Sequence, residues 1–177
     1  AQAYRTLLAA LKLDADITNL LTVLRFAHAP VERKLYGTKH QFGSERRSGG
    51  RSAPLAEHNL FVGPGHLQIS LLSRAASQDT PKAAVEILAG TSYENALRSG
   101  LHAYEQSNQL SSFEKHLRRL RLDWNRRLIE KESLSIGVLL GYLALKINEI
   151  GNLRWIANGI QLGLKPDAIR LELELVS

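Results

Sequence analysis

The chain contains no cysteine and no methionine, and aromatic residues make up only 6% of its 177 residues. Without cysteine it can form neither a disulfide framework nor a thiolate metal site, and it has no cysteine nucleophile. Because aromatic side chains are scarce, leucine and isoleucine must fill most of the hydrophobic core. The missing initiator methionine leads us to expect that Ala1 is not the natural N-terminus.

Long hydrophobic runs are absent as well. The longest nearly apolar stretch is Ser133–Leu145, which Lys146 ends. A helix of this length rises about 20 Å, which is less than the ~30 Å hydrocarbon core of a bilayer. The stretch Ala1–Ala15 lacks the basic start and the cleavage motif of a secretory signal. We therefore expect a protein that does not span a membrane by itself.

The motifs of common catalytic sites are also missing. No phosphate-binding GxxxxGK[ST] sequence occurs, and "GPGHLQ" lacks the third glycine of a dinucleotide-binding loop. Glu130 and Glu132, on either side of Lys131, fit a solvated helix face better than an acid–base pair. The histidines form no HExxH motif and no pair four residues apart, so we expect scattered surface or loop residues: His28, His40, His58, His66, His102 and His116. The sequence thus predicts no catalytic residue, no cofactor and no metal.

Basic residues, in contrast, are plentiful, and the net charge is +6. They gather in residues 33–51 and 115–127, each of which holds six cations and one acidic residue. Basic patches favour nucleic acid, anionic lipid or an acidic protein as partner. The second stretch has no exposed aromatic residues between its cations, because Phe113 and Trp124 belong to the apolar side of the helix expected there. We favour a solvated helix face, with a basic helical nucleic-acid-binding protein as the alternative.

Apolar residues recur at three- and four-residue spacing along most of the chain, which predicts helices. Thr38–Pro54 is rich in glycine, serine and arginine without a period, so we expect a flexible loop. Asp14 or Asp16 is expected to cap a break inside the first helix. The C-terminal "IRLELELVS" alternates like a strand, but a single strand would lack a partner, and we expect a helix or a frayed tail. The fold class is all-α, and the predicted helices are Tyr4–Ala29, His66–Ala76, Pro81–Ala89, Tyr93–Leu101, Ser111–Lys131 and Leu134–Gly163.

Two of these helices share a sequence pattern. "DITNLLTVL" at Asp16–Leu24 matches "EIGNLRWIA" at Glu149–Ala157 in an acid, an isoleucine, an asparagine and a leucine, at a constant offset of 133 residues. We interpret the match as an internal duplication. A buried asparagine can bind the backbone of a neighbour and fix the register between them. Small residues nearby would let the helices of like units cross closely: Gly137, Gly141, Ala144 and Gly151.

The segment Ser133–Leu164 resembles the signature helix of the C subunit of bacterial and archaeal V-type ATPases, whose eukaryotic counterpart is the d subunit. The pattern is a glycine-spaced "GYLALK" followed by an acid, isoleucine, asparagine, leucine and arginine. Its positions here are Gly141, Tyr142, Leu143, Lys146, Glu149, Ile150, Asn152, Leu153, Arg154, Ile156 and Gly159. Two further segments are similar to segments of the family. They are residues 60–97, with their Pro-Gly turn and "LAGTSY", and the stretch "DITNLLTVLR". The resemblance covers most of the chain except Thr38–Glu57.

The resemblance implies a funnel of three similar helical units around a pseudo-threefold axis, of which this chain holds about two. We accordingly divide the chain into residues 1–60, an incomplete helical unit that ends in the basic loop 38–54, and residues 61–177, a second helical unit. In the family, the funnel mouth receives the tip of the central shaft and its base sits on the membrane ring of proteolipid subunits. The implied role is a non-catalytic central-stalk component of a V-type rotary ATPase, peripheral on the cytoplasmic face of the membrane. It would couple shaft and ring for proton or sodium transport linked to ATP hydrolysis or synthesis.

The matching residues are expected to pack helices rather than to catalyse. They are Asp16, Asn19, Gly141, Tyr142, Glu149, Asn152 and Arg154. As contacts to acidic partner surfaces or anionic headgroups we expect exposed arginines of the loop and of the basic helix, namely Arg46, Arg47, Arg118 and Arg119. The resemblance implies other ATPase subunits as partners and no nucleic acid. A nucleic-acid binder would instead lose affinity steeply with salt, and an enzyme would need a pocket with a perturbed titratable group.

Overall fold

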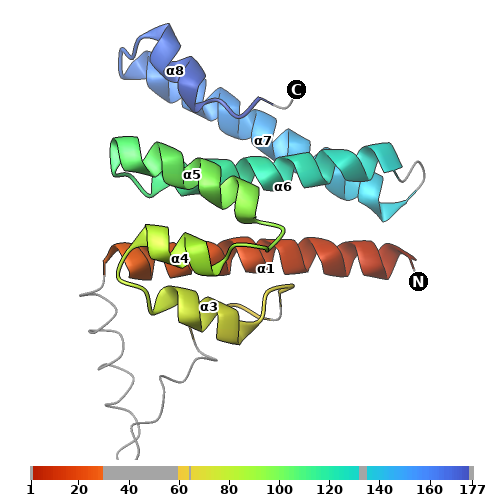
Figure 1. Cartoon of the computed structure of the whole chain (residues 1–177). Coiled ribbons are helices and arrows are strands. Elements are labelled where there is room, and N and C mark those ends of the chain that lie inside the picture. Colours follow the sequence, from red (N-terminus) through yellow and green to blue (C-terminus); the bar gives the residue numbers. More distant parts are fainter. Residues whose placement is uncertain (1, 30–59, 64, 132–134, 176–177) are drawn as a thin grey trace, which may run out of the picture. The chain divides into compact units, whose positions relative to one another are not determined.

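The computed structural model describes residues 2–29, 60–63, 65–131 and 135–175. Within these ranges the backbone forms α-helices and no strand, as Figure 1 shows. The helices are α1 (Gln2–His28), α3 (Ile69–Ala76), α4 (Pro81–Ile87), α5 (Glu94–Ser107), α6 (Ser111–Lys131), α7 (Ile136–Gln161) and α8 (Pro166–Glu172). The predicted all-α class is confirmed. The basic loop 38–54 lies outside the described residues.

The chain divides into two compact units. The larger unit is Leu11–Leu117, and the smaller unit combines Ala1–Ala10 with Arg118–Ser177. α1 and α6 therefore each contribute residues to both units. The division of the chain at residue 60 that the sequence indicates concerns helical repeats rather than compact units, and it stays a prediction.

The larger unit has a closed hydrophobic core. α3 packs on α4, and α4 packs on α5. The largest fully buried apolar side chains of this unit lie on α1, α3, α5 and α6, and one of them lies directly after α4. They are Leu20, Leu24, Leu72, Leu88, Leu97, Phe113 and Leu117. Gly100 brings α5 close to α6, because a Cβ at this position would lie 2.7 Å from Cδ1 of Phe113. Leucine supplies most of this core, as the scarcity of aromatics indicates.

α1 runs through Asp14 and Asp16 without a break, so the predicted cap within this helix is wrong. The Asp16 carboxylate accepts hydrogen bonds from the backbone N–H groups of His66 and Leu67, which lie far along the chain. The aspartate does satisfy free N–H groups, as a cap would. These N–H groups belong to a distant segment rather than to α1 itself. Local sequence spacing carries no information on tertiary partners, so the sequence could not identify them.

α4 begins where the sequence predicts. The side chain of Thr80 accepts a hydrogen bond from the backbone N–H of Ala83, and Pro81 occupies the first turn. Proline is tolerated there because the first-turn N–H groups have no partner within the helix. Gly90, with φ of +80°, lies in the left-handed region just beyond α4. The prediction that Pro81 starts a helix is confirmed.

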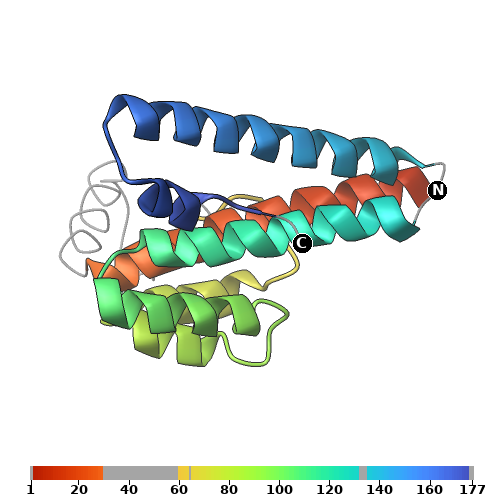
Figure 2. The same cartoon turned by 90° about the horizontal axis from the view of Figure 1, so that it is seen from above.

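The smaller unit is built from α7, which packs against α8 and approaches α6. α8 folds back along α7, as Figures 1 and 2 show. A Cβ at Gly141 would lie 2.6 Å from the carbonyl oxygen of Asn125 on α6, and one at Gly159 would lie 2.8 Å from Ile169 on α8. These glycines allow close packing. At Gly151, in contrast, a Cβ would meet no atom of the described residues within 4 Å. Of the small residues expected to let helices cross closely, Gly141 therefore does so, whereas Gly151 has no close neighbour among the described residues.

The chain leaves α7 through a glycine in the left-handed region. Gly163 has φ of +68°, and the backbone N–H groups of Gly163 and Leu164 bond to the carbonyl oxygens of Ile160 and Gly159. This pattern of bonds is typical of a helix that ends in a left-handed residue. Lys165 is the N-cap residue of α8, and Pro166 occupies its first turn. The alternating C-terminal segment is thus helical up to Glu172, as expected.

α7 also meets the length and composition criteria for a membrane-crossing helix, and it is the one helix of the described residues that does so. A single such helix is weak evidence for a membrane-spanning segment. It carries Lys146, Glu149 and Arg154 in its central part. Ionisable residues at membrane depth are costly.

Candidate functional site

The buried side chain of Asn19 on α1 clamps the backbone of Val62. Its Nδ2 donates to the Val62 carbonyl oxygen at 3.1 Å, and its Oδ1 accepts from the Val62 N–H at 2.8 Å. Both polar groups of one backbone residue are thereby satisfied by one side chain. Because a buried polar group without a partner is costly, this clamp fixes the position of the segment around Val62 along α1.

Asp16, one helical turn before Asn19, is fully buried and serves as a hydrogen-bond centre. Its carboxylate accepts from the N–H of His66 at 2.8 Å, the N–H of Leu67 at 3.1 Å and the hydroxyl of Tyr93 at 2.7 Å. Nδ1 of His66 lies 3.1 Å from Oδ2 of Asp16, and this histidine is half-exposed. A Cβ at Gly65 would collide with the Asp16 carboxylate, so glycine is needed at this position. The carboxylate thus ties three separate segments together.

The buried hydroxyl of Tyr93 is held in its neutral form by this environment. Burial raises the pKa of Tyr93 above its ordinary value, and the hydrogen bond to Asp16 adds to the rise. A tyrosine that stays protonated donates its hydrogen bond throughout the physiological pH range. Tyr93 therefore acts as a structural donor to a buried carboxylate rather than as a proton-transfer group.

Asn152 on α7 makes the same kind of clamp in the smaller unit. Its Nδ2 donates to the carbonyl oxygen of Glu174 at 3.1 Å, and its Oδ1 accepts from the Glu174 N–H at 3.1 Å. Asn148 donates a further bond to the same carbonyl oxygen at 2.8 Å. The side chain of Glu174 is largely buried and pairs with Arg118 at 2.8 Å. The clamp holds the segment after α8 against α7.

The two asparagines thus occupy related surroundings, and each binds both backbone groups of one residue that follows in the chain. The two acids differ. Asp16 is buried among three donor groups, whereas Glu149 is exposed and forms an ion pair with Lys146 at 2.7 Å. The hydrogen bond to Glu149 raises the pKa of Lys146. The duplication that the sequence predicts is therefore supported by the asparagines, while the acids differ in burial.

The other residues predicted as packing positions are spread over α7. Gly141 is buried against α6, Tyr142 is half-exposed with the Lys146 ammonium 5.9 Å from its ring centroid, and Arg154 is exposed. Asp16, Asn19 and Asn152 bind the backbone of other segments and Gly141 lies close to α6, while the packing role of the seven named residues stays a prediction. The set divides between the two compact units, because Asp16 and Asn19 belong to the larger unit and the others to the smaller unit.

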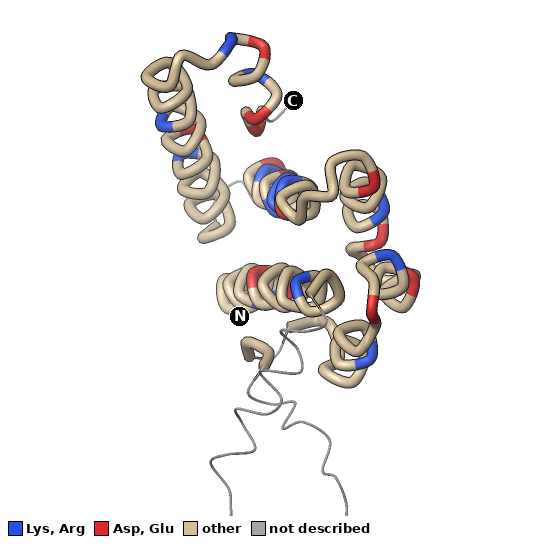
Figure 3. The backbone as a smooth tube through the Cα atoms, turned by 90° about the vertical axis from the view of Figure 1, so that its left-hand side faces the viewer, with Lys and Arg blue, Asp and Glu red and all other residues tan. Residues whose placement is uncertain are grey.

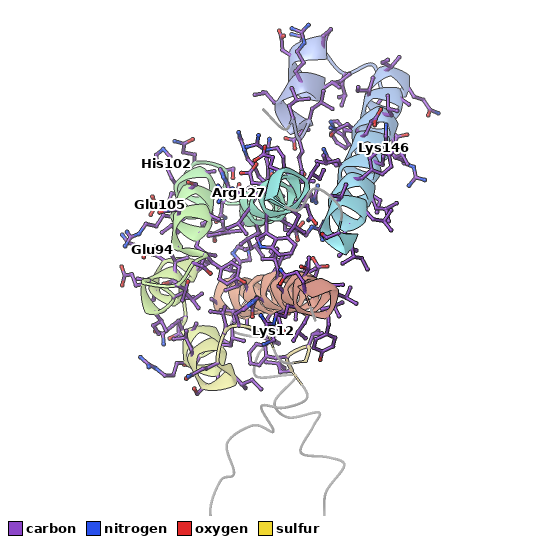
Figure 4. The ribbon with its side chains drawn as sticks, turned by 90° about the vertical axis from the view of Figure 1, so that its right-hand side faces the viewer. Lys12, Glu94, His102, Glu105, Arg127 and Lys146 are labelled. Carbon is purple, nitrogen blue, oxygen red and sulfur yellow. The ribbon has the colours of Figure 1, made fainter. Side chains whose placement is uncertain are left out.

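The predicted partner-contact arginines lie on α6 and in the basic loop. Arg118 and Arg119 are exposed on α6, where cations concentrate, as the blue segments of Figure 3 show. Arg46 and Arg47 lie outside the described residues. Figure 4 shows Arg127 on α6 and Lys146 on α7, with Glu94, His102 and Glu105 along one side of α5. Of the two aromatic residues expected on the apolar side of α6, Phe113 is fully buried, while Trp124 is only half-buried.

Sequence reasoning missed several partners of these polar side chains, among them Val62, Tyr93 and Glu174. Val62 and Glu174 take part through their backbones, so no side-chain pattern marks them. Tyr93 lies in the "LAGTSY" segment that carries part of the resemblance, but a single tyrosine does not reveal its hydrogen-bond partner. Within the described ranges, no group of three or more histidines, cysteines or acids is placed to hold a metal ion. The hydrogen bonds of Asp16, Asn19 and Asn152 hold helices and loops in a fixed register.

Comparisons with known proteins identify similar sequences. The family model described as "ATP synthase (C/AC39) subunit" matches residues 46–172. The chain is 32% identical over 83 residues to the C subunit of the A-type ATP synthase of Methanocaldococcus jannaschii, a stretch that covers 47% of this chain and 21% of that protein. It is 30% identical over 102 residues to the protein of the same name from Haloferax volcanii, covering 58% of this chain and 29% of that protein. For Halobacterium salinarum the identity is 33% over 86 residues, covering 49% and 24%.

The matched stretch therefore spans less than a third of the length of each of these relatives. No solved structure matches the chain. The nucleic-acid alternative finds no support in the matched family or in the names of the relatives. Because the family model covers well over half of the sequence, this chain belongs to the ATP synthase (C/AC39) subunit family.

Proposed function

We propose that this chain is a non-catalytic part of the central stalk of an A- or V-type rotary ATPase. In this role it forms a socket that couples the rotating shaft to the membrane ring of proteolipid subunits, from the cytoplasmic face. ATP hydrolysis or synthesis takes place on other subunits, and this chain transmits the rotation that is linked to proton or sodium transport. Its relatives are named subunits of A-type ATP synthases, which supports a place within such a complex.

One observation carries the non-catalytic role. The polar side chains of Asp16, Asn19 and Asn152 are engaged in bonds that hold segments in register. Asp16 accepts from two backbone N–H groups and a tyrosine, and Asn19 and Asn152 each clamp one backbone residue. Catalytic acids and bases, in contrast, need an accessible group within reach of a substrate.

These clamps also suit a part that transmits torque. Close-packed interiors have low compressibility and pass strain on, and Gly100 and Gly141 bring neighbouring helices into close contact. A side chain that bonds both backbone groups of a residue opposes sliding of the segment along the helix. Shear between helices is the deformation that a rotary load imposes, so register-fixing bonds serve the proposed role.

We place partner contacts on the exposed arginines of α6, with Arg119 as the best candidate. It is exposed, and Arg118 beside it is tied to Glu174. Arg46 and Arg47 of the basic loop remain proposed contacts as well. Acidic surfaces of other subunits, or anionic headgroups at the membrane, would complement these cations.

The test is co-purification of a tagged form of this chain with the central-shaft and proteolipid-ring subunits from its native membrane. We expect both to be recovered, and we expect Arg119→Glu to lower their recovery. Arg98→Glu on α5, another exposed arginine, is the matched control for a change of the same charge. Recovery of neither partner with the unaltered chain contradicts the proposal.

A further inference from the structure

The apolar residues of α7 recur with a seven-residue period, which is the period of a coiled coil. Starting at Ile136, every seventh residue and the third residue after each of these are apolar, with Lys146 as the one exception within α7. We call these positions the α7 seam: Ile136, Leu139, Leu143, Lys146, Ile150, Leu153, Ala157 and Ile160. A strict seven-residue repeat keeps such positions facing one partner when two helices coil around each other.

The α7 seam is also the exposed side of the helix. Every seam position is exposed, and the exposed fraction of its large apolar side chains runs from 37% at Ile136 to 69% at Ile160. The residues of α7 that approach α6 or α8 closely, or that bind the backbone of Glu174, lie outside the seam. They are Gly141, Asn148, Asn152 and Gly159. α7 therefore has one side that binds its own unit and another side that carries the coiled-coil period.

The charges at the middle of α7 favour a partner of the same sequence in the antiparallel orientation. Two parallel seams in register would place Lys146 opposite Lys146 of the second copy, where like charges repel. An antiparallel pair centred on Asn148 instead places Lys146 opposite Ile150 of the second copy. Glu149 of the second copy then lies at nearly the same level as Lys146 and on the same side of the pair. Within one chain these two residues already form an ion pair at 2.7 Å.

We propose that the α7 seam pairs with the α7 seam of a second copy of this chain, as an antiparallel two-stranded coiled coil. The interface is isologous, so each seam residue towards one end of α7 meets a seam residue towards the other end. The pair extends over the whole of Ile136–Gln161. The lysine within the seam costs stability, but together with Glu149 it specifies register and orientation. α7 lies wholly within the smaller unit, so the larger unit takes no part in the pairing.

A bilayer fits this side of α7 less well than a second copy. Lys146 lies within the seam and Glu149 lies beside it, and ionisable residues at membrane depth are costly. In the antiparallel pair, the same two residues meet opposite charges on the second copy. The proposal does not rest on the central-stalk role. A monomeric chain would overturn the pairing and leave the co-purification test of that role unaffected.

The first test is sedimentation equilibrium of the full chain, which measures the dissociation constant of a dimer. We expect the unaltered chain to form dimers. Leu153→Asp should raise the dissociation constant at least about tenfold, because symmetry places two carboxylates against apolar side chains. Leu162→Asp, at an exposed leucine outside the seam, is the matched control and should leave the dissociation constant unchanged. Both variants should keep the far-ultraviolet circular dichroism spectrum of the unaltered chain.

The second test reports the orientation, and it uses the lack of cysteine in this chain. An antiparallel pair centred on Asn148 brings Leu143 of one copy next to Leu153 of the other. A mixture of Leu143→Cys and Leu153→Cys chains should therefore form a covalent dimer with a short bismaleimide reagent. A mixture of Leu143→Cys and Leu162→Cys chains is the control and should cross-link less. Equally efficient cross-linking of the Leu143→Cys chain with itself indicates parallel helices and overturns the proposal.

An exchange of charges tests the same orientation without cross-linking. Glu149→Lys places a cation beside Lys146 of the second copy and should weaken the dimer. Adding Lys146→Glu to that variant should restore the affinity, because opposite charges meet again. Weakening without this rescue overturns the antiparallel arrangement. A chain that stays monomeric overturns the proposal, and binding to lipid vesicles that Leu153→Asp abolishes would then identify a membrane as the partner of the seam.

Discussion

At the scale of single residues, the asparagine clamps are the features whose removal should cost most stability. Asn19→Ala leaves the N–H and carbonyl groups of Val62 without their partners, and we expect a loss of about 2 kcal/mol in the free energy of unfolding. Asn152→Ala should cost about 1 kcal/mol, because Asn152 is only half-buried. Urea denaturation measures both. Asn158→Ala, at an exposed position of α7, is the control, and an equal loss there would contradict the role of the clamps.

The buried hydroxyl of Tyr93 predicts a loss of stability at alkaline pH. Its pKa is raised in the folded chain above the ordinary 10.0, so folding favours the neutral hydroxyl. This contribution is complete below pH 10 and is lost as the pH rises from about 10 towards the folded pKa. Tyr93→Phe should cost about 1.5–3 kcal/mol at pH 7, because a hydrogen bond to a charged group is lost.

Urea midpoints at pH 7 and about 11 test this expectation, since the fall between them should be smaller for Tyr93→Phe than for the unaltered chain. Tyr142→Phe, at a half-exposed ring on α7, is the control for removal of a phenol. An alkaline loss of the same size in Tyr93→Phe would show that other groups cause it.

At the scale of elements, two glycines of α7, Gly151 and Gly141, differ in how closely other residues approach them. A Cβ at Gly151 would meet no atom of the described residues within 4 Å, so Gly151→Ala should stabilise the chain by about 0.5–1 kcal/mol through the better helix propensity of alanine. A Cβ at Gly141 would lie 2.6 Å from the carbonyl oxygen of Asn125, so Gly141→Ala should destabilise the chain by about 1–3 kcal/mol through overpacking. Thermal unfolding of the two variants measures the difference. Equal effects of both substitutions would contradict the close approach of α6 and α7.

At the scale of the whole molecule, the two compact units differ in how completely their cores are closed. The larger unit buries leucines and a phenylalanine fully, whereas α7 exposes most of its large apolar side chains. Regions with few buried apolar contacts open more easily. We therefore expect the amides of α7 and α8 to exchange with solvent faster than those of α1 between Leu13 and Ala27. Hydrogen exchange followed by mass spectrometry tests this, and equal rates in both segments would contradict it.

The sequence alone determined the class and the places of the helices. Periodicity predicted Ser111–Lys131 with the bounds that the structure shows, and Thr80-Pro81 marked the start of α4, because spacing, caps and proline act within a few residues. The repeated asparagine marked the two positions that form the clamps, Asn19 and Asn152. These signals are local, and they can be recognised without knowledge of the tertiary structure.

Only the tertiary structure decided the partners and the degree of burial. The same pattern gives a buried acid at Asp16 and an exposed one at Glu149, since burial depends on which segment covers the helix. Likewise, Gly141 and Gly151 are alike in sequence, but only Gly141 has a helix against it. Backbone partners such as Val62 leave no side-chain signal at all. Contacts between distant segments depend on how the chain closes on itself, and that information is absent from any short stretch of residues.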